Sequence, residues 1–194
     1  MIVCIPLGWI TYSYPLMLNV NYAYLLNAKL DMPISNRVDL NRSRCIEKAR
    51  KENDDLIILD TDAVIGNTPT ELKKILREYK REVVVGITMN DNGILVKPPP
   101  PPDKEKFEVE WASLSFVYLP KRVLQKLKPI DYYGGITPMY MTYTSRTSED
   151  VDFITRLRKM KIRVIADKRV HVLHFKLLPL QYQEIHFEVN TKGQ

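Results

Sequence analysis

The sequence predicts an α/β domain in which helices flank a mixed, mainly parallel sheet. Short apolar segments alternate with segments of helical periodicity, and the length of 194 residues suits one domain. One apolar segment, Leu56–Leu59, has the composition of a strand buried on both faces, and it stops at Asp60 and Asp62. Because ligands of open α/β sheets bind beyond the carboxyl ends of the strands, we expect the functional site at this edge.

The composition, 45% hydrophobic and 27% charged, is that of an ordinary globular protein. A formal charge of +6 favours anionic ligands such as nucleoside diphosphates, but the basic residues are scattered, so dedicated nucleic-acid binding is not expected. No signal peptide or transmembrane segment is expected, and a cytoplasmic location follows. Cys4 and Cys45 have no metal-binding spacing and are interpreted as buried, reduced side chains.

Two helices are predicted between the first strand and the site strand. The strand Ile2–Ile5 ends at Pro6, which places the following loop at the same sheet edge as Asp60. The periodic segments run from Pro15 to about Lys29 and from about Leu40 to Lys51. Arg42 lies in the first turn of the second helix, where the helix dipole disfavours a cation, and this hints at a nearby anion. A solvated surface arginine is the alternative interpretation.

The second half of the chain continues the alternation. Thr68 and Glu71 form a capping box, which marks a helix start. The expected elements are then a helix from Pro69 to about Arg81, a strand at Glu82–Met89 with a hairpin turn into Ile94–Lys97, a strand within Phe107–Leu119, a short helix around Val123–Leu127, a long loop over the site at Asp131–Thr147, a helix at Glu149–Met160, and strands at Ile162–Ala166 and Val170–His174.

In this order the motifs resemble those of GT-A fold glycosyltransferases, which use nucleotide-diphospho-sugar donors, and the match runs from Ile2 to His174. The resemblance implies a single Rossmann-like domain with its nucleotide-binding part at about 1–97, its acceptor-side part at about 107–174 and a peripheral tail at 175–194. It also implies that Asp60, Asp62 and His174 bind Mn²⁺ or Mg²⁺. The implied donor-binding residues are Pro6, Leu7, Arg42, Asp60 and Trp111.

The x-Glu-Asp motif of that family falls on Ser148–Asp150, so Glu149 and Asp150 are the implied catalytic residues. The glycine-rich segment that lines the donor sugar falls on Trp111–Phe116, where this chain has alanine and serines instead. The acceptor is a hydroxyl of an unknown glycan, protein or lipid. A stand-alone enzyme of this size would suit a virus of hyperthermophilic archaea, with the host cytoplasm as its location.

Simple chemistry supports the same function. Glycosyl transfer needs a metal to neutralise the departing diphosphate and a carboxylate to take the proton of the acceptor hydroxyl. Two alternatives remain open. Leu56–Val64 also resembles the opening motif of haloacid-dehalogenase-like phosphatases, with Asp60 as nucleophile and Asp62 as acid/base. The other alternative is a non-catalytic nucleotide- or polyanion-binding module, in which the two aspartates only close a turn.

Overall fold

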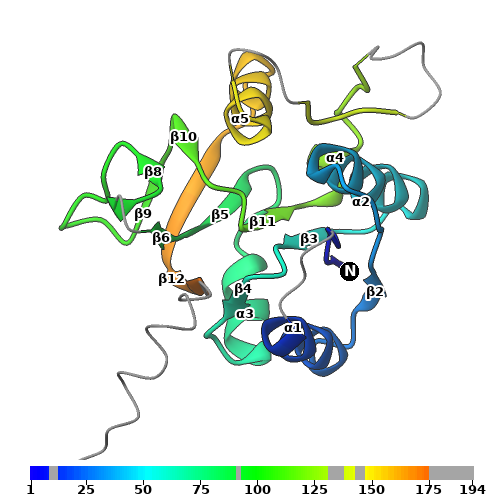
Figure 1. Ribbon diagram of the computed structural model, residues 1–194. Coiled ribbons are helices and arrows are strands. Elements are labelled where there is room, and N and C mark those ends of the chain that lie inside the picture. The colour runs from blue at the N-terminus through cyan, green and yellow to red at the C-terminus, as the bar shows by residue number, and fades with distance from the viewer. Residues whose placement is uncertain (9–12, 91–92, 131–137, 143–146, 175–194) are drawn as a thin grey trace, which may run out of the picture.

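The computed structural model describes residues 1–8, 13–90, 93–130, 138–142 and 147–174. Within these ranges, eight strands form one sheet in the order β2-β1-β3-β11-β5-β12-β4, with β9 paired to β12 (Figure 1). Strands β2, β1, β3, β5 and β12 run in one direction, whereas β11, β4 and β9 run against them. The mixed, mainly parallel sheet is therefore confirmed. The first strand and the Asp60 strand are adjacent and parallel, as expected.

The elements of the main sheet have the following bounds. The strands are β1 (Ile2–Cys4), β2 (Lys29–Asp31), β3 (Leu56–Leu59), β4 (Ala63–Ile65), β5 (Val83–Ile87), β9 (Lys106–Glu108), β11 (Phe116–Leu119) and β12 (Val164–His174). The small pairs outside it are β6 (Met89–Asn90) with β7 (Gly93–Ile94), and β8 (Val96–Lys97) with β10 (Trp111–Ala112). The helices are α1 (Ser13–Leu25), α2 (Val38–Glu52), α3 (Pro69–Leu76), α4 (Lys121–Leu124) and α5 (Glu149–Lys159).

Helices cover both faces of the sheet (Figure 1). Alternate residues of β3 point to opposite faces, so Ile58 packs in one hydrophobic cluster with α2, α4 and α5, and Ile57 packs in a second with α1 and α3. This two-sided burial explains the uninterrupted apolar composition of Leu56–Leu59. Among the described helices, none combines the length and the apolar character needed to cross a bilayer.

Several elements differ from those expected. Helix α1 ends at Leu25 instead of about Lys29, and β2 begins at Lys29. The Thr68 capping box forms, but α3 ends at Leu76 instead of about Arg81. The segment from Phe107 to Leu119 makes three short strands, because each pairs with a different partner. The two closing strands are one strand, β12, with an irregularity between Ala166 and His171. Strands β2 and β4 were not predicted, since three residues carry too little periodicity to show a strand.

The long loop predicted over the site lies partly outside the described residues. Apart from Thr147, its described part is 138–142, which packs against α2, where the backbone N–H groups of Tyr140 and Met141 donate to Ser43 Oγ at 3.0 and 3.2 Å. Both side chains are fully buried. This part of the segment therefore belongs to the core, and the prediction of a loop over the site was wrong for it.

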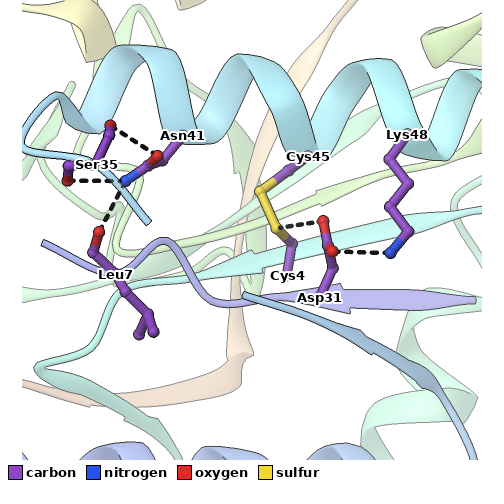
Figure 2. Close-up of a disulfide and its surroundings, with 7 residues drawn as sticks. All are labelled: Cys4, Leu7, Asp31, Ser35, Asn41, Cys45 and Lys48. Atoms are coloured by element: carbon purple, nitrogen blue, oxygen red, sulfur yellow. Dashed lines mark hydrogen bonds and ion pairs between the residues drawn. A yellow bond between two sulfur atoms is a disulfide. The ribbon is translucent and has the colours of Figure 1, made fainter. Parts of the chain in front are cut away.

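The two cysteines form a disulfide, so the prediction that they are reduced was wrong. Cys4 lies on β1 and Cys45 on α2, with their Cα atoms 6.0 Å apart (Figure 2). Both residues are fully buried, and the Asp31 carboxylate, held by Lys48 Nζ at 2.8 Å, lies beside the Cys4 sulfur. Their sequence separation of 41 residues gave no sign of this contact, which depends on how α2 packs on the sheet.

Reduction of this disulfide is expected to lower the free energy of unfolding by about 4 kcal/mol, because a crosslink across a loop of this length restricts the unfolded chain. Urea unfolding with and without a dithiol reductant measures the change. The Cys4→Ser/Cys45→Ser variant is the control, since its unfolding midpoint should not respond to the reductant. Equal midpoints for the oxidised and reduced wild type would show that the crosslink contributes nothing.

Candidate active site

A cavity of about 430 Å³ lies at the sheet edge beyond the carboxyl ends of β1 and β3. Most of the site residues predicted from the sequence line this cavity. They are Pro6, Arg42, Asp60, Asp62, Glu149, Asp150 and His174. Leu7 and Trp111 are not among its lining residues, and Ser113 and Ser115 line it instead of Trp111. Residues from both halves of the chain thus meet at one edge, as the order of the motifs predicted.

Arg42 is the centre of this cavity's charge network. Its guanidinium donates to both carboxylate oxygens of Asp60 at 2.8 Å, to Glu149 Oε1 at 2.9 Å and to Asp150 Oδ1 at 2.7 Å. The residue is only 3% exposed, so these bonds form largely out of water. The anion near the start of α2 is therefore a group of protein carboxylates. Binding of donor phosphate by Arg42 stays a prediction, and it requires Arg42 to leave some of these partners.

Among the described residues that line the cavity, negative charge exceeds positive charge. Four carboxylates, those of Asp60, Asp62, Glu149 and Asp150, face the single guanidinium of Arg42. Burial raises the pKa of Asp150, Arg42 opposes this shift, and the neighbouring Asp60 adds to it. Burial alone would lower the pKa of Arg42, but the three carboxylates raise it, so the guanidinium stays charged. The remaining negative charge calls for a further cation.

Asp62 and His174 form the part of the site best suited to a metal. Strand β4 pairs antiparallel with β12, with Ala63 opposite His174, and this register places His174 Nε2 3.3 Å from Asp62 Oδ2. Burial raises the pKa of Asp62, an effect opposed by His174 and increased by Asp60. One carboxylate and one imidazole fit Mn²⁺, with positions left for phosphate oxygens and water.

A second group of potential ligand residues, Cys4, Asp31 and Cys45, lies on the same side of the sheet as α2. Its two sulfur atoms are bonded to each other and provide no thiolate. A cysteine binds a metal as its thiolate, so in the disulfide-bonded protein this group offers only the Asp31 carboxylate and does not compete with Asp62 and His174 as the metal site.

Asn19 was not predicted as a site residue, yet it braces the turn that carries both aspartates. It is fully buried on α1, and its side-chain Nδ2 donates to the backbone carbonyls of Asp60 at 3.3 Å and Ala63 at 2.7 Å. The available signal was a polar residue at helical spacing from Leu16 and Ala23 on an apolar face. That pattern marks a buried polar group but does not identify its partners.

Replacement of Asn19 by Leu is expected to lower stability by about 1 to 3 kcal/mol, because the two carbonyls lose a buried donor. Mn²⁺ affinity should fall as well, since the turn positions Asp62. The matched control is Asn21→Leu, at an exposed position of the same helix. Thermal unfolding and Mn²⁺ titration of both variants measure the effect. Equal stability of the two variants would show that Asn19 does not hold this turn.

No protein-family model matches the sequence, and no curated protein matches it. Solved structures do match. A197 from STIV is 19% identical, with a TM-score of 0.64 and coverage of 91% of this chain and 85% of A197. GalNAc-T7, crystallised with UDP, GalNAc and Mn²⁺, is 13% identical, with a TM-score of 0.55 over 91% of this chain but 44% of its own. HddC from Yersinia pseudotuberculosis is 14% identical, with a TM-score of 0.51 over 94% and 96%. The chain has the GT-A fold.

Within this GT-A fold, the segment Ser113–Ser115 contacts both Asp60, which follows β3, and Asp150, at the start of α5. The Asp60 N–H donates to the Ser115 carbonyl at 3.0 Å, and the Leu114 N–H donates to Asp150 Oδ2 at 3.3 Å. The segment therefore fixes Asp60 and Asp150 from one side, while Arg42 fixes them from the other. Contacts of Trp111 and Leu7 with a donor stay predictions.

Proposed function

We propose that this protein is a metal-dependent glycosyltransferase that moves a sugar from a nucleotide-diphospho-sugar to an acceptor hydroxyl. One observation carries the proposal. One cavity at the expected edge of a GT-A fold contains a metal-suited pair, Asp62 with His174, beside a partly buried group of carboxylates held by Arg42. The pair supports binding of a metal–diphosphate, and the cluster supports proton transfer.

Asp62 and His174 would hold the metal, which when bound neutralises the negative charge that develops on the departing diphosphate. The net negative charge of the cavity favours a divalent cation there. Asp60 accepts two hydrogen bonds from Arg42 with its two oxygens, so direct coordination by Asp60 requires one of these bonds to break. We therefore assign the direct carboxylate ligand to Asp62 and a supporting position to Asp60.

The acceptor proton would pass to Asp150. Its side chain is 19% exposed against 6% for Glu149, so an acceptor hydroxyl reaches Asp150 more readily. Burial raises the pKa of Asp150 and makes the carboxylate a better proton acceptor. Arg42 and the Leu114 N–H orient the two oxygens of this group. Glu149, held by Arg42 at 2.9 Å, then supports the orientation of the guanidinium.

The test is a panel of nucleotide sugars, assayed with Mn²⁺ for release of the nucleoside diphosphate and for sugar transfer. The proposal expects metal-dependent release from at least one donor. Release of phosphate from a generic phosphate ester, with no action on any donor, would favour the phosphatase. That alternative needs a free Asp60 nucleophile, whereas Arg42 engages both Asp60 oxygens. Nucleotide binding without turnover of any donor would favour a non-catalytic module.

A further inference from the structure

A second recess, of about 730 Å³, lies at the opposite edge of the sheet from the candidate active site. Asn53, which ends α2 before β3, lines it together with residues that follow the antiparallel strand β11 and precede β5. Asp60 lies at the far end of β3, so the two cavities are separated by the length of that strand. We call this second cavity the basic recess, because its charged lining residues are Arg81, Lys121, Arg122 and Lys126.

Among the described residues that line the basic recess, four are positively charged and none has a carboxylate. Within the described part of the chain, none of its four cations takes part in an ion pair, although a neighbouring cation such as Arg163 pairs with Glu82 at 2.6 Å. All four residues are exposed to solvent. Clustering like charges without partners is unfavourable, and an anion would relieve the repulsion.

The backbone beneath these cations is well fixed. The Lys121 N–H donates to Asp55 Oδ1 at 2.8 Å, and the Gln125 side chain donates to the Arg50 carbonyl at 2.9 Å. Val123 is buried and forms part of the recess lining. The short helix α4 is thus anchored to the end of α2 and the start of β3. A ligand would need to order only the long side chains, which lowers the entropic cost of binding.

We propose that the basic recess binds a phosphate-bearing anion at a site separate from the donor site. A ligand group with two or more negative charges matches several positive charges better than a ligand with a single carboxylate does. The two guanidinium groups can bind phosphate oxygens in pairs. The volume lies within the range of about 300 to 1,000 Å³ that small-molecule sites occupy. Both a soluble polyphosphate and the headgroup of an anionic lipid have this chemistry.

Calorimetric titration with inorganic tripolyphosphate, without divalent metal, tests the proposal. Arg122→Gln/Lys126→Gln removes two charges from the recess, and Lys74→Gln/Arg158→Gln removes two exposed charges that do not line it. We expect the first variant to lose at least about tenfold in affinity, because it removes two of the four positive charges that line the recess, and hydrogen bonds to charged groups are among the stronger ones. The second variant should bind as the wild type does. Equal losses of affinity in both variants would show that binding depends only on the net charge of the protein, and this would overturn the proposal.

Co-sedimentation with vesicles identifies the source of the phosphate. One set contains phosphatidylcholine with phosphatidylglycerol, and the other contains phosphatidylcholine alone. Recess-dependent binding to the first set only supports a lipid headgroup, and recess-dependent binding of tripolyphosphate without vesicle binding supports a soluble ligand. Binding to neither probe would overturn the proposal. Mn²⁺-dependent nucleotide binding should be the same in both variants, so a failure of this proposal leaves the active-site proposal intact.

Discussion

Asparagine in place of Asp150 is expected to lower turnover by about 10² to 10⁴-fold while Mn²⁺ and nucleotide binding stay nearly normal. The amide keeps the size of the carboxylate and can keep the hydrogen bond from the Leu114 N–H, but it cannot accept the proton of the acceptor hydroxyl. Burial also raises the pKa of Asp150. When the pH is lowered, the wild-type enzyme should therefore lose activity at a higher pH than it would if this base had the pKa of an ordinary aspartate. Steady-state rates and nucleotide titration measure the two effects.

Asp152→Asn is the matched control, because it removes the same charge from the first turn of α5 without changing a residue that lines the cavity. It should leave turnover nearly unchanged. Loss of donor binding in the Asp150 variant would place this residue in the donor site. If the Asp150 variant keeps its turnover, either Glu149 is the base or the reaction needs no protein base. Glu149→Gln distinguishes these two outcomes.

The second large effect is expected from Asp62→Ala, which should abolish the Mn²⁺ dependence of nucleotide binding. The substitution removes an oxygen ligand and a negative charge and leaves His174 without its neighbouring carboxylate at 3.3 Å. Calorimetry with UDP and GDP in the presence of Mn²⁺ measures the loss. Thr61→Ala is the control, since Thr61 also lines the cavity but has no charge. Undiminished Mn²⁺-dependent binding in the Asp62 variant would exclude it as a metal ligand.

The sequence was most informative where local chemistry and periodicity coincide. The apolar segment Leu56–Leu59 identified its strand, and the capping box at Thr68 identified the start of α3, because both signals come from neighbouring residues. The ordered motifs also predicted that Asp62, Asp150 and His174 meet at one sheet edge. That expectation came from the resemblance to GT-A fold glycosyltransferases. The shared carboxyl edge of the parallel strands β1 and β3 explains the position of the Asp60 turn, whereas the start of α5 positions Asp150.

Contacts that depend on tertiary packing were not predictable in the same way. Strand β4 is three residues long, yet its pairing with β12 sets the position of His174 beside Asp62. The three-carboxylate environment of Arg42 and the partner of Cys45 both depend on how α2 packs against the sheet. A single sequence contains no direct record of those long-range pairings. Short strands and buried polar contacts therefore had to come from the structure.

We propose that one metal-dependent site at the carboxyl edge of the sheet binds the diphosphate of a nucleotide sugar. Calorimetric titration of the wild-type protein with UDP and GDP, first with Mn²⁺ and then with a chelator, tests this proposal. We expect one nucleotide to bind with Mn²⁺ and to lose most of its affinity with the chelator. At about a hundred times its dissociation constant it should also stabilise the fold by about 2.7 kcal/mol. Equal binding with and without metal, or no binding of either nucleotide, would contradict the proposal.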